Sequence, residues 1–165
     1  MLKKYIQAAM AGMLLVMLAA IPAAQAQLAK SGSYSLHDGW TASGRAIEVG
    51  EAHMYWVGEF KGAGRLLIDG VLFKHYGGDC SAANDIIDGM ANVSGYCRFT
   101  DEDGDLLFAK FGAQSPAGGP TMVGSADFIA GTGKYTGIRA HHDFTCYNVG
   151  TSEISCLGEG KYELP

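Results

Sequence analysis

The sequence predicts an all-β domain that closes into an antiparallel barrel of about eight strands. Glycine is abundant, at 24 of 165 residues, and proline is rare, at 4. Short segments rich in Tyr, Phe, Val, Ile and Trp run between the glycines, which is typical of strands joined by tight turns. The segment 90–102 is longer than an average strand, and long strands joined by hairpins close into barrels because closure removes exposed edges.

The first 26 residues have the order of a secretory signal peptide. Lys3 and Lys4 are followed by an uncharged apolar segment, and residues 24–26 (Ala-Gln-Ala) have the small-x-small form of a cleavage site. The apolar segment is shorter than the ~20 residues that a membrane span needs. We therefore expect residues 1–26 to be removed and residues 27–165 to form a single barrel domain. The processed protein is expected to be periplasmic or secreted, with no stable membrane insertion.

The expected mature chain is acidic. Cleavage removes two lysines and no acidic residue, so the net charge changes from −5 to −7. A surface of this sign repels the phosphate backbone, and we expect no nucleic acid among the partners.

The strands are expected to lie between glycine-rich breaks. Segments of alternating or continuous apolar character give about eight: 33–37, 40–49, 52–61, 65–76, 79–87, 90–102, 105–112 and a closing hairpin within 138–163. The segment 113–124 contains two prolines and is expected to be a long irregular loop at the mouth of the barrel.

The Asp-Gly pair at 88–89 predicts a two-residue type I′ hairpin. Ile87 then pairs with Met90, and counting outward along the two strands brings Cys80 opposite Cys97 on a non-hydrogen-bonded pair. The Cα atoms of such a pair are about 4.5 Å apart, which is within the range of disulfide geometry. One turn therefore predicts one disulfide.

The other two cysteines predict a second disulfide. Cys146 and Cys156 bracket a loop at 148–151 between strands near 138–147 and 154–162. An even number of cysteines in an exported chain favours disulfides. No pair of cysteines has the close spacing of a structural zinc site, so we expect no metal.

The segment 52–61 alternates and has two distinct faces. Met54, Trp56 and Phe60 lie on one face, and Tyr55 and Glu59 lie on the other. We expect the first face to point toward the interior of the barrel. If the second face pointed inward instead, Tyr55 and Glu59 would line a polar cavity that could support acid–base chemistry.

The segment 138–147 contains the adjacent histidines His141 and His142, which must point to opposite faces of a strand. His142 shares the more apolar face with Phe144 and Cys146, so it is the inward candidate. A single inward histidine is more often a hydrogen-bonded core residue than a catalytic one.

Residues 128–137 read Phe-x-x-Gly-Thr-Gly-Lys-Tyr-x-Gly, which resembles a segment of the allene oxide cyclase-like and dirigent-like barrels. The Gly-Tyr-Cys at 95–97, the Asp-rich turn at 101–105 and the tail at 160–165 are similar to small exported bacterial proteins grouped with that barrel. The resemblance covers about the last 70 residues. It implies an eight-stranded antiparallel barrel with an apolar cavity, used without a cofactor by allene oxide cyclases on a lipid epoxide and by dirigent proteins to orient phenoxy radicals. No catalytic position of either group matches a residue of this chain.

Two further motifs have simpler explanations. Gly-Thr-Gly-Lys at 131–134 lacks the spacing of a phosphate-binding loop, because position 128 is Phe and Tyr135 follows the lysine. The acidic segment 101–105 has its glycine in fourth place, whereas a calcium loop needs it in sixth place. Its Asp-Gly pair at 103–104 suits a hairpin turn like the one at 88–89. We therefore expect no cofactor.

These observations favour a protein that binds a small apolar or aromatic ligand inside the barrel. We expect the ligand to contact Trp56, Met54, Phe60, Tyr55, His142 and Phe144. One alternative is a cofactor-free cyclase or isomerase, with His142 and Glu59 as candidate catalytic residues. Another is a secreted interaction or inhibitor protein that uses loop 113–124. We favour binding over catalysis.

Overall fold

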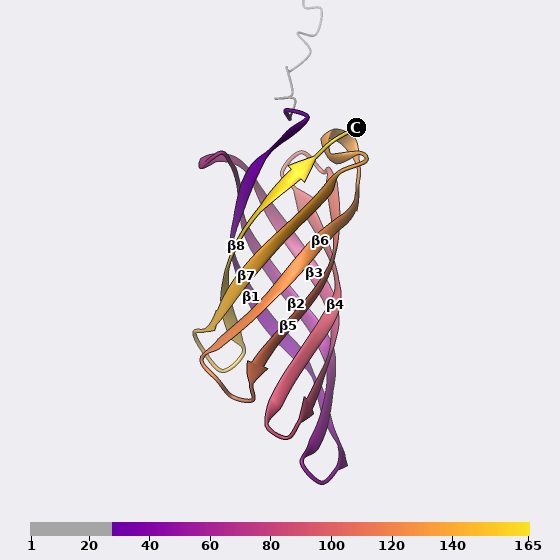
Figure 1. Cartoon of the computed structure of the whole chain (residues 1–165), viewed down its shortest axis with the longest axis vertical. Coiled ribbons are helices and arrows are strands. Elements are labelled where there is room, and N and C mark those ends of the chain that lie inside the picture. Colours follow the sequence, from indigo (N-terminus) through magenta and orange to yellow (C-terminus); the bar gives the residue numbers. More distant parts are fainter. Residues whose placement is uncertain (1–27) are drawn as a thin grey trace, which may run out of the picture.

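Residues 28–165 of the computed structural model form one closed antiparallel barrel (Figure 1). The strands follow one another around the barrel in sequence order, and the last strand pairs with the first. They are β1 (Ser31–Gly50), β2 (His53–Ile68), β3 (Val71–Ile87), β4 (Met90–Asp101), β5 (Leu106–Pro116), β6 (Thr121–Gly131), β7 (Arg139–Asn148) and β8 (Glu153–Glu163), with a 3-10 turn, η1 (Gly133–Tyr135), between β6 and β7. The predicted fold class is confirmed, whereas the predicted signal peptide lies outside the described residues.

The predicted breaks in the first half of the barrel are wrong. The segments 33–37 and 40–49 belong to the single strand β1, and β2 and β3 continue through Gly62 and Gly78. The turn between β2 and β3 is instead Asp69-Gly70, where both residues have positive φ, +49° and +81°. The glycines inside these strands are needed for packing: an added Cβ at Gly62 or Gly78 would overlap the indole ring of Trp40.

The predicted long loop at 113–124 is also wrong. Its first four residues belong to β5 and its last four to β6, so the connection spans only 117–120. Pro116 is tolerated at the end of β5 because the ladder with β4 ends there, at Met90. Strand β6, which the count of apolar segments omitted, follows directly.

The two Asp-Gly pairs form different turns. Asp88 and Gly89 both have positive φ, and Ile87 pairs with Met90, as the type I′ hairpin requires. At 103–104 the two-residue prediction is wrong, because only the glycine has positive φ and its amide donates to the carbonyl of Asp101 at 2.9 Å. This connection is longer and leaves the Asp101 side chain inside the barrel wall.

Both predicted disulfides are confirmed. Cys80 bonds to Cys97 and Cys146 bonds to Cys156, each across a directly opposite strand pair with Cα atoms 4.0 Å apart. All four sulfur-bearing side chains point into the barrel, where they line its cavity. The two bridges clamp β3 to β4 and β7 to β8.

The larger part of the core fills the end of the barrel that carries η1 and the C-terminus, which is the upper end in Figure 1. Buried aromatic and aliphatic residues from most strands meet there, among them Tyr34, Leu66, Tyr76, Phe99, Leu107, Phe128, Tyr135 and Tyr162. A smaller cluster around Val93 lies toward the opposite, lower end, where Trp56, Phe111 and Phe144 pack against it. Residues 28–165 contain no helix with the length and apolar character of a membrane span.

An ionic cluster closes the upper end of the barrel. The Lys134 ammonium lies 2.6 Å from the carboxylates of Asp101 and Asp105 and 3.1 Å from that of Asp103. The Tyr135 hydroxyl donates to Asp101 Oδ2 at 2.9 Å. The lysine of the Gly-Thr-Gly-Lys motif is therefore occupied by three carboxylates of the preceding hairpin.

Candidate functional site

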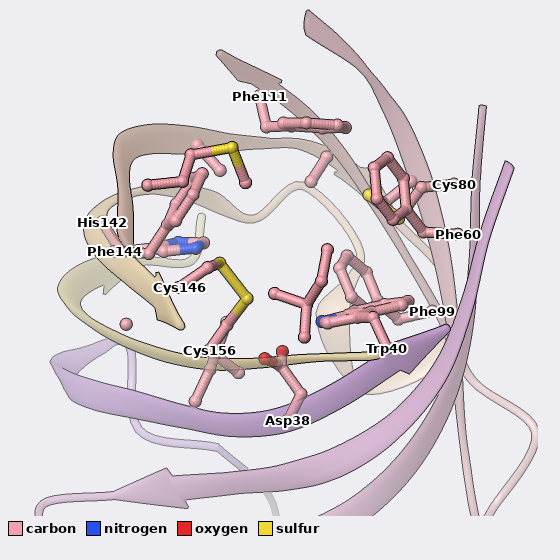
Figure 2. A pocket seen from close by; sticks show the side chains of 17 residues that line it. Asp38, Trp40, Phe60, Cys80, Phe99, Phe111, His142, Phe144, Cys146 and Cys156 are labelled. Atoms are coloured by element: carbon pink, nitrogen blue, oxygen red, sulfur yellow. A yellow bond between two sulfur atoms is a disulfide. The ribbon is translucent and has the colours of Figure 1, made fainter. Parts of the chain in front are cut away.

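A cavity of about 90 Å³ lies in the barrel interior, on the side of the core away from η1 (Figure 2). All eight strands contribute to its wall, which is almost entirely apolar. The largest contributors are Leu36, Trp40, Phe60, Phe99, Phe111 and Phe144, together with the two disulfides. Figure 2 shows the two disulfides on different sides of the cavity.

The space exists because the tryptophan rings are recessed into the wall. Trp40 pairs with Gly62, which pairs with Gly78, so its indole lies flat across two strands at positions that have no side chain. Trp56 lies in the same way against Gly44 and Gly58. Aromatic rings that lie along the wall leave the centre of the barrel open.

Asp38 is one of two ionisable groups in the cavity wall, and its carboxyl group points into the cavity (Figure 2). Tyr76 donates a hydrogen bond of 2.7 Å to Oδ2, whereas Oδ1 is buried without a partner among the described residues. Burial raises the pKa of Asp38, although the hydrogen bond from Tyr76 and the polar indole N–H of the neighbouring Trp40 oppose the shift. The free oxygen is therefore a hydrogen-bonding group without a partner in an apolar cavity.

His142 is the other ionisable group of the wall, and it is 5% exposed. Its Nδ1 atom lies 2.7 Å from the Tyr34 hydroxyl. Burial raises the pKa of Tyr34 and keeps its hydroxyl protonated, so we assign Tyr34 as the donor and place the ring proton on Nε2. Burial also lowers the pKa of His142 to about 4, so the ring is neutral near pH 7.

Lowering the pH is expected to destabilise the protein through His142. The imidazole titrates at about 4 in the folded state and at about 6.5 in the unfolded state, so between these values the unfolded state binds more protons. Stability should fall as the pH drops through this window, by at most about 3 kcal/mol, at 1.36 kcal/mol per pKa unit. The raised pKa of Asp38 acts in the opposite direction.

The measurement is urea unfolding at pH 7 and pH 4.5 of the wild type and of His142→Asn, whose Oδ1 takes the position of the imidazole Nδ1 and can accept the Tyr34 hydrogen bond. The difference between the two proteins isolates the histidine. Equal pH dependence in both would contradict this assignment.

Three of the residues predicted to contact the ligand line the cavity: Phe60, His142 and Phe144. Trp56 and Met54 are on the same inner face as Phe60, but they lie farther along β2. Trp56 packs in the lower cluster, and Met54 is 43% exposed near the tip of the hairpin.

Tyr55 and Glu59 lie outside the cavity. Neighbouring residues of a strand alternate in direction, and because Phe60 points inward, both residues face the outside of the barrel. The Glu59 carboxylate is exposed and lies 3.9 Å from the Lys61 ammonium. The structure therefore does not bring Glu59 together with His142.

The prediction missed Asp38 and Trp40. The break predicted near Gly39 left Asp38 between two short strands and placed Trp40 at the start of the second. A continuous alternation was present, since Tyr34, Leu36, Asp38 and Trp40 all share one face of β1. Treating Gly39 as a strand residue would have placed the carboxyl group inside the barrel.

No family model and no curated protein matches the chain. Among solved structures, the pterocarpan synthase dirigent protein PsPTS1 is similar, with a TM-score of 0.51 and 11% identity over 84% of this chain and 97% of that one. The pterocarpan synthase dirigent protein GePTS1 gives a TM-score of 0.43 and 15% identity over 82% of this chain and 90% of that one. The first of these likenesses shows that the fold is a dirigent-like barrel.

Proposed function

We propose that this chain is an exported barrel protein that binds one small apolar or aromatic molecule in its interior. The observation that carries the proposal is the cavity with an apolar wall and a buried carboxyl oxygen, Asp38 Oδ1, that lacks a partner among the described residues. Ligand pockets combine a mostly apolar wall with a few polar groups that fix orientation. A ligand hydroxyl or amine would supply the missing hydrogen bond.

The cavity size limits the ligand. An apolar cavity of about 150 Å³ holds benzene, whereas this one has about 90 Å³. A ligand with one aromatic ring would therefore extend toward the lower end of the barrel, where Phe111, Met122 and Phe144 line the way. The polar end of the ligand would lie at Asp38.

Export is supported by the covalent structure. All four cysteines form disulfides, which persist in oxidising compartments such as the periplasm or the cell exterior. The leader-like sequence at 1–26 supports the same compartment.

The test compares p-cresol with toluene, two probes of similar shape that differ by one hydroxyl group. We expect p-cresol to bind about fivefold more tightly, because one added hydrogen bond contributes about 1 kcal/mol. Ala126→Phe places a ring in the cavity wall and should abolish binding of both probes.

The matched control is Ala63→Phe, which adds the same ring on the exposed outer face of β2 and should leave binding unchanged. Isothermal titration calorimetry measures both affinities. Binding that survives Ala126→Phe would show that the probes do not occupy the cavity. Native mass spectrometry of protein from its own host would identify a retained ligand.

A second candidate function is a cofactor-free cyclase or isomerase. It is favoured by the chemistry of the two wall groups, since a carboxyl group with a raised pKa can donate a proton and a neutral imidazole, with its Nδ1 bonded to Tyr34, can donate a hydrogen bond from Nε2 to a ligand oxygen. In that case Asp38→Asn, which keeps the shape of the side chain, would retain binding of the host ligand and lose its turnover. If the wild type binds the host ligand and leaves it chemically unchanged after incubation, the cyclase or isomerase function is contradicted and the binding function is supported.

A further inference from the structure

A long stretch of β1 has a strand edge without a neighbour. Pairing between β1 and β8 runs from Ser31 to Thr41, and one further bond joins the Ala42 amide to the Ser152 carbonyl at 2.8 Å. Pairing between β1 and β2, in contrast, continues to Gly50. Residues 43–50 therefore have a hydrogen-bonded neighbour on one side only. Figure 1 shows the β1–β2 hairpin extending at the lower end beyond the loop between β7 and β8.

This edge carries few of the features that protect natural edges from pairing. Proline, charged side chains and bulges commonly block an edge. The segment 43–50 contains no proline or lysine, its two charged residues are Arg45 and Glu48, and all eight residues are exposed. Its only bulge lies near the tip, between Glu48 and Gly50. Ile47 and Val49 are 45% and 58% exposed. On the other side of the lower end, β4 is covered, because its pairing with β5 continues to the Met90–Pro116 pair, where β4 begins and β5 ends.

Exposed apolar residues also lie on the outer face near the edge, around the polar pair of His53 and Asp85. Ile47 pairs with Tyr55 on β2, and the nearby pair of Ile87 and Met90 is also exposed, each side chain at 44%. Exposed apolar residues grouped beside an unpaired edge are typical of an interaction surface. The partner must supply an extended segment with its own unpaired edge.

We propose that residues 43–50 of β1 pair in antiparallel fashion with the same segment of a second copy of this chain. An isologous contact about a two-fold axis needs a segment that complements itself. An axis at Ile47 places this side chain opposite the partner's Ile47 and places Ala46 opposite the partner's Glu48. The two Glu48 carboxylates then do not face each other.

Charge supports the same arrangement. Arg45 lies toward one end of the segment, and Glu48 and Glu51 lie toward the other, so antiparallel pairing places the arginine of each copy near the acidic end of its partner. Among residues 28–165, Arg45 and Glu51 take part in no ion pair. An axis at Glu48 would instead set like charges opposite each other, which is unfavourable.

Pairing of two copies would also extend the wall at the lower end of the barrel. Ala46 pairs with Trp56 and Glu48 pairs with Met54, and these four residues share the inner face of the extension. A second copy would continue this sheet by adding its own β1 beside them. The interface therefore borders the end of the barrel toward which a bound ligand would extend.

The test is sedimentation velocity on the disulfide-bonded protein over a range of concentrations. The wild type should form a concentration-dependent dimer, and Ile47→Lys should raise the dimer dissociation constant about tenfold because it removes the apolar Ile47–Ile47 contact and sets two like charges directly opposite each other. The matched control is Val123→Lys, which replaces an exposed valine (59%, against 45% for Ile47) at a position of β6 that is paired on both sides. This control should dimerise like the wild type.

Amide hydrogen exchange locates the contact independently of the variants. Amides within 43–50 should gain protection when the protein concentration rises through the dimer dissociation constant. A wild type that stays monomeric at a concentration of about 0.5 mM would overturn the proposal, because its dimer dissociation constant would then be roughly millimolar or weaker. A dimer that forms without protecting 43–50, or that resists Ile47→Lys, would overturn it as well.

Discussion

Asp101→Ala should lower the free energy of unfolding by about 3 kcal/mol, because it removes a buried carboxylate that accepts several hydrogen bonds and leaves the buried Tyr135 hydroxyl without its acceptor. The Asp101 carboxylate is 3% exposed and accepts hydrogen bonds from the Lys134 ammonium and the Tyr135 hydroxyl. It also accepts the amides of Asp103 and Asp105 at 2.9 and 3.0 Å. The variant therefore disturbs the connection between β4 and β5 together with η1. Urea unfolding followed by circular dichroism measures the loss.

A matched variant separates this effect from the loss of any aspartate. Asp79 pairs with Arg98 at 2.9 Å on the outside of the barrel, where both side chains are more than half exposed. Asp79→Ala should cost less than about 1 kcal/mol, because exposed ion pairs are screened by water and salt. If the two variants lose the same amount, the cluster at the upper end is not a buried network.

Removal of both disulfides should lower the free energy of unfolding by about 6 kcal/mol. Each bridge closes a short loop, with sequence separations of 17 and 10, and loop-closure entropy for loops of this length gives about 3 kcal/mol per bridge. Total stabilities of single domains are about 5–15 kcal/mol. The variant without all four cysteines, with alanine at each position, should therefore be marginally folded at 25 °C.

Single-bridge variants provide the internal control. One double variant lacks the Cys80–Cys97 bridge and the other lacks the Cys146–Cys156 bridge. Because the two bridges join different strand pairs, the two losses of unfolding free energy should sum to that of the fourfold variant within about 0.5 kcal/mol. Urea midpoints of the oxidised and the reduced wild type give an independent measure. A fully reduced protein with an unchanged midpoint would contradict the expected contribution.

The fold class and both disulfides could be predicted from the sequence because they depend on patterns among neighbouring residues. The turn at 88–89 determines the register of β3 on β4, and this register places Cys80 opposite Cys97. The alternation of β7 likewise indicated that His142 and Phe144 point inward. Period-two patterns and turn chemistry are properties of neighbouring residues, so they can be read without the tertiary structure.

The errors arose where tertiary packing decides the role of a residue. Gly62 and Gly78 were interpreted as breaks, although they lie in the middle of strands to make room for an indole ring that comes from β1. The same interpretation of Gly39 hid Asp38, which became visible as a wall residue only when β1 was continuous. Whether a glycine ends a strand or lies under an aromatic ring depends on the neighbouring strands, which a sequence does not place.

Because the indole rings lie against glycines of the barrel wall, these glycines determine the volume of the cavity although they do not line it. A methyl group added at Gly78 would meet the Trp40 ring at 2.6 Å and push it toward the barrel axis, which narrows the cavity although Gly78 is not among the residues that line it. Related barrels could therefore differ in the size of molecule they admit while every lining side chain stays the same. Engineering a wider or narrower bore in this protein should begin with the glycines.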